Sequence, residues 1–422
     1  MRSVPKKNIG ILIGSLEVGG AQTMALQLLK LLTQNGFNAY LFSMDKNKDS
    51  RLPGNRSMQK QISRRIILLS QSSVTRGPVI KAISAVMIYS RLVRLISEKE
   101  IDVMISFMER ANILNLLLKS VKTKIISIRI HVQRLNDKSL LKQWVIKMLY
   151  PFLLKRADIV NFNSLESAGS FSSKFSIDKK KISVIHNFCD PDHLTKKSLE
   201  SVQWTYDYLF EKQVIVSSGR LVRQKGHHEL IRAFADLCQT NEQAMLMIIG
   251  EGPLRKELVE LSRSLGIKER VVFENFHKNL VACLKKSTVF VLSSHVEGFP
   301  NVLLEALSIG LPVISTDCSS GPRELLAPET DPFVKTQTID YAQFGVLTPP
   351  FSSLTINKDS LSCAEKKLSQ AMGILLEKKE MRDHYRQNAR ARAAMFSEKN
   401  IQQKWLELFE SPRVHNRDKN LS

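Results

Sequence analysis

Short apolar runs typical of buried strands alternate with helical stretches along this chain, and the alternation starts twice. The first series begins with residues 8–15 (NIGILIGS) and ends with residues 181–187 (KISVIHN). The second begins with residues 213–221 (QVIVSSGRL). Strands that alternate with helices form βαβ units, in which the strands run parallel. The sequence therefore predicts two α/β domains with parallel sheets, with the boundary between them inside residues 188–212.

Two further stretches complete this outline. Residues 45–65 are polar and basic, which predicts a loop or an irregular insertion after the second strand. Residues 401–409 (IQQKWLELF) have the spacing of an amphipathic helix. A chain of 422 residues with 43% apolar residues is long enough and apolar enough to build two cores.

Two carboxylates, Glu297 and Glu305, stand near the end of one predicted strand of the second half. Gly298 and Pro300 break the chain after the first acid, and the second falls inside a helical pattern, VLLEAL. In an open α/β sheet, ligands bind at the carboxyl ends of the strands, so both acids can face one polar ligand. A carboxylate accepts two hydrogen bonds from a vicinal diol, which makes a sugar or a ribose a natural partner. The alternative, an acid placed for the helix dipole, explains only one of the two.

Two cations, Arg220 and Lys225, follow the first strand of the second half, flanked by Gly219 and Gly226. An arginine offers a planar fork of donors and a lysine a compact point charge. At the carboxyl end of a strand and before a helix, this pair predicts a clamp for a diphosphate.

The segment EGFPNVLLEAL resembles the E-x7-E signature of the retaining nucleotide-sugar glycosyltransferases of family 4. The resemblance extends in order over most of the chain, through GSLEVGGAQTMAL, SSGRLVRQKGHHELIRAF, IIGEGPLRKELVELSRSLGIKERVVFENF and EGFPNVLLEALSIGLPVISTDCSSGPRELL. It implies the GT-B fold, in which two Rossmann-like domains with parallel sheets face a central cleft. The expected parts are an acceptor-binding domain at 1–190, a linker at 191–212, a nucleotide-sugar-binding domain at 213–390, and a final segment at 391–422 whose helix crosses back to the first domain.

The resemblance also assigns roles to the four charged residues. Glu305 matches the family residue that binds the ribose hydroxyls, and Glu297 matches the one that faces the donor sugar. Arg220 and Lys225 match the pair that holds the donor diphosphate. They would stabilise the leaving nucleoside diphosphate without a metal, by electrostatic preorganisation.

A further catalytic residue is expected after a strand of the first half. Family members carry there either a histidine that contacts the donor sugar or an Arg-Asn pair. This chain has Arg129 and His131 in the text RIH, which departs from both patterns. Either residue is therefore a candidate for the contact with the donor sugar.

Other donor contacts are expected from loops whose backbone can approach a phosphate or a sugar. These candidate residues are Gly19, Gly20, Gly250, Gly298, Phe299, Asn301 and Val302. A simple β-turn remains the alternative for Gly250. The dinucleotide fingerprint G-x-G-x-x-G is absent near Gly19, which argues against a dehydrogenase.

On the acceptor side, Glu109 and Asn112 follow the strand at residues 101–107, and a polar helix start is the alternative for both. Asp190-Pro191-Asp192 has the form of a metal-binding D-x-D motif. We reject the metal interpretation, because the motif falls in the expected hinge and two-domain transferases of this type do not use such a metal. No metal and no other cofactor is expected. The five cysteines are scattered singly, which favours a reducing compartment.

The positive charge lies almost entirely in the first half of the chain. Residues 1–200 contain 33 Lys and Arg and 14 Asp and Glu, a net charge of +19, whereas residues 201–422 contain 29 and 26, a net charge of +3. This asymmetry predicts an anionic partner for the first half. Two predicted helices there, VIKAISAVMIYSRLVRLI and LLKQWVIKMLYPFLLKR, mix apolar faces with Lys and Arg. Packing against the sheet is the alternative for most of their apolar residues, and a solvated basic face without a specific partner is the alternative for the charge. We expect peripheral contact with an anionic membrane surface through part of that half.

The expected function is that of a retaining glycosyltransferase at the cytoplasmic face of a membrane. It would transfer a sugar from a nucleotide sugar, expected to be UDP-linked, to a lipid-linked, phosphorylated or polysaccharide acceptor of a cell-surface glycan. The alternatives are a nucleotide-sugar epimerase on the same fold and a non-catalytic basic module. A phosphorylase would need a longer chain with a pyridoxal site. Nucleic acid is not expected as a partner, because the sequence carries no recognised nucleic-acid motif.

Overall fold

The computed structural model describes residues 7–17, 19–45, 56–70, 78–129, 150–201, 211–277, 279–352 and 360–410. By its internal contacts the chain divides into two compact units. Unit 1 consists of Met1–Asn163, Ser167–Asn187 and Ile401–Ser422. Unit 2 consists of Ser164–Glu166 and Phe188–Asn400.

Unit 1 is built on a parallel sheet, whose described strands have the order β3-β2-β1-β4-β5-β6-β7. In register, Ile9 of β1 pairs with Ala39 of β2 on one side and with Val103 of β4 on the other. The central strands β1, β4 and β5 are buried along almost their whole length, because helices cover both faces of such a sheet. The strands are β1 (Asn8–Ile13), β2 (Asn38–Ser43), β3 (Ile66–Leu68), β4 (Val103–Phe107), β5 (Thr123–Ile128), β6 (Ile159–Phe162) and β7 (Ile182–Val184).

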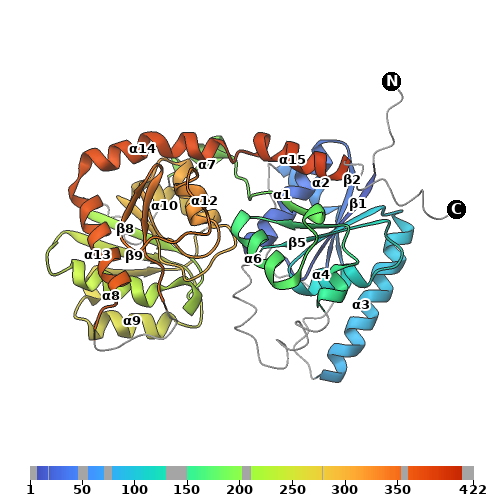
Figure 1. Ribbon diagram of the computed structural model, residues 1–422, viewed down its shortest axis with the longest axis horizontal. Coiled ribbons are helices and arrows are strands. Elements are labelled where there is room, and N and C mark those ends of the chain that lie inside the picture. Colours follow the sequence, from blue (N-terminus) through green and yellow to red (C-terminus); the bar gives the residue numbers. More distant parts are fainter. Residues whose placement is uncertain are drawn as a thin grey trace. The chain divides into compact units, whose positions relative to one another are not determined.

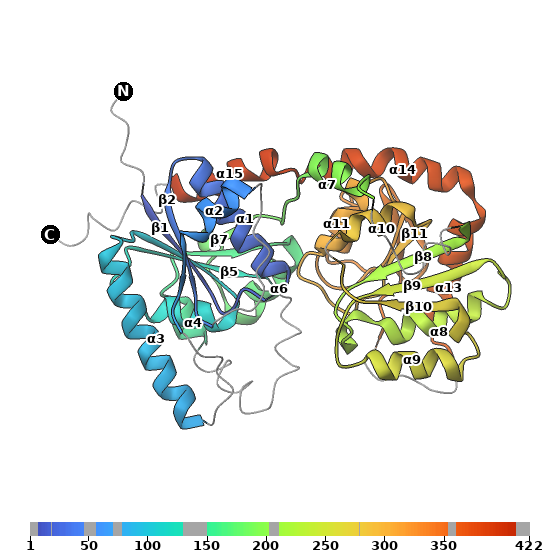
Figure 2. The same cartoon turned by 180° about the vertical axis from the view of Figure 1, so that it is seen from behind.

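Helices lie on both faces of this sheet, with α1 and α2 on one side and α3 and α4 on the other (Figures 1 and 2). The helix α15 buries Ile401, Trp405 and Phe409, which are spaced four residues apart and so share one face. The helices are α1 (Gly20–Gln34), α2 (Arg56–Ser63), α3 (Pro78–Glu98), α4 (Glu109–Leu117), α6 (Leu165–Phe175), the 3-10 helix η2 (Lys179–Lys181) and α15 (Glu398–Glu410).

The prediction of a loop or irregular insertion at residues 45–65 was wrong for its second part, where α2 forms. This helix buries Ile62 completely, and Met58, four residues earlier, is half-buried. With only these two large apolar residues in eight, its periodic signal is too weak to stand out from a polar loop.

Unit 2 repeats the architecture, and its described strands have the order β10-β9-β8-β11-β12-β14-β13. All pairings are parallel except that of β13 with β14, which is antiparallel. The short edge strand β13 was not predicted, because its sequence DYA carries no apolar run. The strands are β8 (Gln213–Ser218), β9 (Ala244–Ile249), β10 (Val271–Glu274), β11 (Val289–Leu292), β12 (Val313–Thr316), β13 (Asp340–Ala342) and β14 (Gly345–Thr348).

The helices of unit 2 also cover both faces of its sheet, with α8 and α9 on one side and α10, α11 and α14 on the other (Figures 1 and 2). These helices are α7 (Pro191–Ser198), α8 (His227–Leu237), α9 (Arg255–Ser264), α10 (Leu280–Lys286), α11 (Asn301–Ser308), α12 (Pro322–Leu326), α13 (Cys363–Glu377) and α14 (Lys379–Ala394), with the 3-10 helices η4 (Arg223–Lys225) and η5 (Lys268–Arg270). The predicted α/β class with parallel sheets is confirmed for both units.

The Asp190-Pro191-Asp192 motif starts the helix α7. The Asp190 side chain caps this helix by accepting a hydrogen bond from the backbone N–H of His193 at 2.9 Å. Pro191 occupies the first helical position, and Asp192 adds a negative charge to the first turn, where the helix dipole favours it. The motif is thus a helix start. Residues 191–198, expected to be linker, form a helix that belongs to unit 2.

Candidate active site

The charged residues singled out in the second half gather at one edge of the sheet of unit 2. The strands β8, β9 and β11 run parallel, so their carboxyl ends lie at the same edge. Arg220 and Lys225 follow β8, Gly250 follows β9, and Glu297 follows β11. This edge is where α/β sheets bind their ligands.

An ion pair joins two of these loops. The Lys225 ammonium lies 2.6 Å from Glu297 Oε1, and the side chains are 19% and 9% exposed. The Ser294 hydroxyl donates a second hydrogen bond to the same carboxylate oxygen, at 2.5 Å. A charge pair so little exposed to water is held in a defined geometry, whereas an exposed pair is loose and weak. The structure therefore brings together two residues that are 72 positions apart in sequence.

The loop that carries Lys225 is fixed to the loop after β11 by its backbone. Gly226 has a φ of +62°, and a Cβ at this position would lie 1.9 Å from the carbonyl oxygen of Ser293. The Ser293 hydroxyl donates to the carbonyl of Lys225 at 2.9 Å, and the Gln224 amide donates to the carbonyl of Val296 at 2.6 Å. Only glycine satisfies both the left-handed backbone and the close approach. These contacts set the position of Lys225 relative to Glu297.

Gly250, a predicted donor contact, has a close structural neighbour in the loop after β8. A Cβ at Gly250 would lie 1.9 Å from the carbonyl oxygen of Gly219. The two loops are also joined by the hydrogen bond from the N–H of Leu221 to the carbonyl of Glu251, at 2.9 Å. Gly219 in turn faces the aliphatic stem of Lys225, whose Cδ would stand 3.4 Å from an added Cβ. The glycines thus let the two loops cross beneath the ammonium group.

The substitution Gly250→Ala is expected to lower the free energy of unfolding by about 3 kcal/mol, because the new methyl group meets backbone atoms that cannot move aside. Chemical denaturation measures this change. The control is Gly14→Ala, since a Cβ there would meet no atom within 4 Å, and its effect should stay within about 0.5 kcal/mol. Equal stability of Gly250→Ala and the wild type would contradict the close crossing of the two loops.

Arg220 is exposed, and within the described parts of the chain its guanidinium has neither a hydrogen bond nor an ion pair. It lies in the same loop as Lys225. A long cationic side chain that has no protein partner retains all its donors for an anionic ligand. Of the two cations, Lys225 is therefore bound to a carboxylate, and Arg220 is available to a ligand.

Glu305 lies in α11, the helix that follows the Glu297 loop, and is half-buried. Burial raises the pKa of its carboxyl to about 7, and the positive charge of Lys197 in α7 opposes this rise. The carboxyl group therefore titrates near neutral pH, where a small change in its surroundings decides its charge.

The turn between Glu297 and α11 is held by packing. Phe299 is 5% exposed, and its ring centroid lies 5.5 Å from that of Phe396. Pro300 directly precedes α11, whose first residues are Asn301 and Val302. The first N–H groups of a helix have no partner within it and attract negatively charged groups. Together with half-buried Gly298, these residues place a helix start beside the Glu297 carboxylate.

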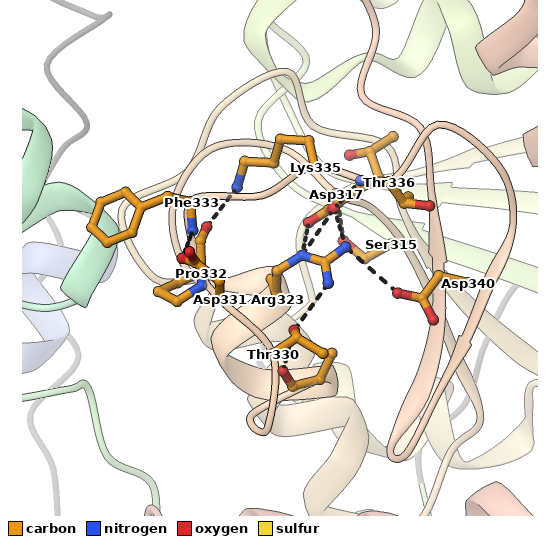
Figure 3. Close-up of polar contacts among 12 residues, drawn as sticks. Ser315, Asp317, Arg323, Thr330, Asp331, Pro332, Phe333, Lys335, Thr336 and Asp340 are labelled. Carbon is orange, nitrogen blue, oxygen red and sulfur yellow. Dashed lines mark hydrogen bonds and ion pairs between the residues drawn. The ribbon is translucent and has the colours of Figure 1, made fainter.

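A buried polar network supports the same edge from β12 (Figure 3). Arg323 donates from Nε to Asp317 at 3.0 Å and from Nη1 to the Thr330 hydroxyl at 3.0 Å. Asp317 also accepts from the backbone N–H of Thr336 at 2.8 Å. Two residues after Asp317, the carbonyl of Ser319 accepts from the N–H of Glu297 at 2.9 Å. The network thus holds the loop on which the backbone of Glu297 rests.

In unit 1, the structure places Arg129 and Asn112 in a buried network. Arg129 donates to Ser127 at 2.8 Å and to Asn187 at 2.8 Å, and its guanidinium lies 5.2 Å from the Phe107 ring and 5.6 Å from the Trp405 ring. Burial lowers the pKa of this guanidinium to about 9. Arg129 thus has several partners within unit 1, and its contact with a donor sugar remains a prediction.

Asn112 is 2% exposed and accepts from the Ser106 hydroxyl at 2.8 Å, which makes it part of the core beneath the sheet edge. Glu109 is the half-buried first residue of α4. Gly19 directly precedes α1, whose first residue is Gly20, and its extended φ of −179° places no special demand for glycine. His131 lies outside the described residues.

Sequence reasoning missed the residues that position the charged groups. Ser294 and Gln224 orient Glu297 and its loop, and His295 pairs with Glu229 at 2.9 Å nearby. The only indication of these residues in the sequence was the polar segment SSH, residues 293–295, which directly follows the apolar residues of β11. Among the residues that the structure describes, no cluster of three or more His, Cys, Asp or Glu could hold a metal ion.

Comparisons with known proteins identify the family and the fold. The family model "Glycosyl transferases group 1" matches residues 209–344, and "Glycosyltransferase Family 4" matches residues 18–193. An uncharacterized glycosyltransferase of Methanocaldococcus jannaschii is 36% identical over 271 residues, which are 63% of this chain and 66% of that protein. The N-acetylgalactosamine-N,N'-diacetylbacillosaminyl-diphospho-undecaprenol 4-alpha-N-acetylgalactosaminyltransferase of Campylobacter jejuni is 28% identical over 94% of this chain and 97% of that protein.

Among solved structures, HepE of Anabaena in complex with UDP and glucose has a TM-score of 0.72 at 18% identity, covering 96% of this chain and 100% of that one. Sucrose-phosphate synthase of Thermosynechococcus elongatus has a TM-score of 0.74 at 17% identity, covering 97% and 100%. At such low identity the likeness concerns the fold. The two family models, the relatives and the fold agree: the chain belongs to glycosyltransferase family 4 and is a glycosyltransferase with the GT-B fold.

Proposed function

We propose that this protein transfers a sugar from a UDP-linked donor to an acceptor of a cell-surface glycan, with retention of configuration and without a metal. The ion pair between Lys225 and Glu297 at the carboxyl edge of unit 2 carries the proposal, because it places a cation beside a carboxylate in a partly buried site. A cation suits a diphosphate, and a carboxylate suits sugar hydroxyls. The structure of HepE with UDP and glucose supports the choice of the nucleotide.

In the proposed reaction, Arg220 and Lys225 bind the diphosphate and stabilise the charge that develops on it as the bond to the sugar breaks. Cations that are already in place beside the developing charge stabilise it without reorganisation. Glu297 orients the sugar, and Glu305 binds the ribose hydroxyls. The acceptor hydroxyl attacks on the face from which the nucleotide leaves, and the departing phosphate takes its proton. The resemblance of EGFPNVLLE to the E-x7-E signature supports retention.

The proposed acceptor is a glycan on a lipid carrier, reached at the cytoplasmic face of the membrane. Two Campylobacter jejuni relatives are named for acceptors on diphospho-undecaprenol or PP-undecaprenol. The excess charge of +19 in residues 1–200 suits an anionic surface and a phosphorylated acceptor. Within the described residues, no helix is long and apolar enough to cross a bilayer.

A panel of sugar nucleotides tests the proposed donor. Calorimetry without added metal should show saturable binding of one UDP-sugar, and of UDP itself. Product analysis of donor incubated with lipid extract should show a labelled lipid-linked glycan with the anomeric configuration of the donor. Binding of no nucleotide, or conversion of the donor to an epimer without transfer, would reject the proposal.

The affinity for UDP is expected to rise between pH 6 and pH 8. Burial raises the pKa of Glu305 to about 7, so the carboxyl is mostly neutral at pH 6 and mostly ionised at pH 8. Ionised acceptors make stronger hydrogen bonds with hydroxyl groups than neutral ones do. Calorimetric titrations of UDP across this range should show a steeper rise in the wild type than in Glu305→Gln, because ionisation of the terminal phosphate of UDP contributes equally to both proteins. If the UDP affinity of both proteins changes equally with pH, a group other than Glu305 is responsible for the change.

A further inference from the structure

The helix α3 in unit 1 carries apolar side chains on two faces. Ile88, Leu92 and Ile96 are at most 3% exposed and pack into the core. On the outward face, the exposed fractions are 55% for Ile83, 66% for Val86 and 66% for Met87. These three residues are spaced as i, i+3 and i+4, so they form one continuous patch. Large exposed apolar patches of this kind mark interaction sites.

The outward face changes character along the helix. After the three apolar residues come Ser90, Arg91 and Arg94, all exposed. In both views the amino-terminal end of α3 extends away from the sheet of unit 1 (Figures 1 and 2). The apolar patch lies in the half of the helix toward that end, since α3 spans Pro78–Glu98. The outward face thus carries an apolar patch followed by two exposed arginines, of which Arg94 forms an ion pair with Glu98 at 2.6 Å.

All charged residues in the stretch from residue 50 to residue 97 are basic. Residues 50–97, which include α2, β3 and nearly all of α3, contain nine Lys and Arg and no Asp or Glu. Among the Lys and Arg of this stretch whose side chains the structure describes, Lys60, Arg64, Arg91 and Arg94 are exposed. A surface with this charge is complementary to an anionic partner, and the apolar patch adds a demand for a hydrocarbon environment.

We propose that the α3 tip, formed by Ile83, Val86 and Met87, inserts into the interfacial layer of an anionic bilayer. The surrounding Lys and Arg would bind the lipid headgroups, each contributing an attraction that salt screens. Because the inserted part is short, binding is reversible and needs no spanning helix. This inference rests on the proposed function, because an enzyme with a lipid-linked acceptor must bind a membrane. It adds that α3 is the element in contact with the bilayer.

Vesicle sedimentation with the full chain tests the tip. The probes are vesicles of phosphatidylcholine alone and of phosphatidylcholine with phosphatidylglycerol, each at low and high salt. We expect the wild type to bind only the anionic vesicles, and to dissociate at high salt. The variant Ile83→Ser/Val86→Ser/Met87→Ser should bind at least tenfold more weakly, because the apolar contribution is lost. Binding of this variant equal to that of the wild type would overturn the proposal, as would equal binding to both vesicle types.

A matched control carries three serines at positions of similar exposure in unit 2. Leu199, Val334 and Met395 are 73%, 59% and 57% exposed, and their triple replacement should leave vesicle binding unchanged. Insertion is measured directly by a fluorophore sensitive to polarity, attached to Met87→Cys in a Cys363→Ser background. Its emission should shift to the blue only when anionic vesicles are added. A blue-shifted emission without vesicles would overturn the proposal, because another part of the chain or a second copy would then cover the tip.

UDP binding separates this inference from the proposed function. The triple variant of the tip should bind UDP as the wild type does, since the tip lies in unit 1 and the charged site in unit 2. If the wild type does not bind UDP, the proposed function is rejected, whereas the membrane contact is still supported by vesicle binding. Normal UDP binding with no vesicle binding would reject only the membrane contact.

Discussion

Lys225→Ala is expected to reduce kcat by roughly 10²-fold or more, because the reaction loses one preorganised charge that stabilises the leaving diphosphate. The fold should survive the change. The Lys225 side chain is 19% exposed and lies over Gly219 without entering the core. Glu297 keeps one partner, because the Ser294 hydroxyl still donates to it at 2.5 Å. Steady-state kinetics with the donor found in the nucleotide panel measures the effect.

The control for this variant is Lys285→Ala, which removes an exposed lysine at another place in unit 2. Lys285 lies at the end of α10 and contacts the carbonyl of Ile309 at 3.5 Å. Its replacement should leave kcat within about twofold, since it lies outside the charged site. Near wild-type turnover in a folded Lys225→Ala protein would remove Lys225 from the diphosphate site. A loss in both variants would point to a general effect on unit 2.

The strand and helix pattern allowed most of the fold to be predicted, because parallel strands in α/β proteins are continuous apolar runs. The strand NAYLFS was predicted at the residues where β2 forms. The elements that failed are short and polar. Helix α2 has only two large apolar residues, and β13 is an edge strand of three residues. Their stability comes from contacts with the rest of the unit, which local sequence does not reveal.

For the candidate site, too, one part could be predicted from the sequence and another could not. Glu297, Arg220 and Lys225 could be placed at one sheet edge, because the carboxyl ends of parallel strands meet there. That Lys225 binds Glu297 could not be predicted, since the contact depends on the left-handed turn at Gly226 and on its close approach to Ser293.

Arg129 and Asn112 show what the sequence leaves open. Both follow strands and carry polar groups, and their contacts with a ligand remain predictions. In the structure they form hydrogen bonds within unit 1, with Ser106, Ser127 and Asn187. A sequence shows that a polar residue stands at the end of a strand. It does not show whether neighbouring side chains already occupy its donors and acceptors, which is decided by packing.

Changing Glu297 or Glu305 to glutamine is expected to change the affinity for UDP in opposite directions. In the resting site, Glu297 neutralises Lys225 at 2.6 Å and would repel the diphosphate that binds to the same cation. Glu297→Gln removes both effects, so UDP should bind more tightly, by up to about tenfold, which corresponds to about 1.4 kcal/mol. Turnover of the intact donor should nevertheless fall by roughly 10²-fold, because the sugar loses its charged hydrogen-bond acceptor. Glu305→Gln should instead weaken UDP binding, since the ribose hydroxyls lose theirs.

Calorimetry with UDP and kinetics with the donor, carried out on the same preparations, separate these outcomes. The decisive comparison is the sign of the change in UDP affinity, because a merely structural role would weaken binding in both variants. Glu297→Gln that binds UDP more weakly than the wild type would show that the carboxylate supports the nucleotide and does not compete with it. If the expected signs are found, the ion pair also provides for product release. Once the sugar has left, Glu297 can compete again for Lys225, and the nucleoside diphosphate loses the cation that held it.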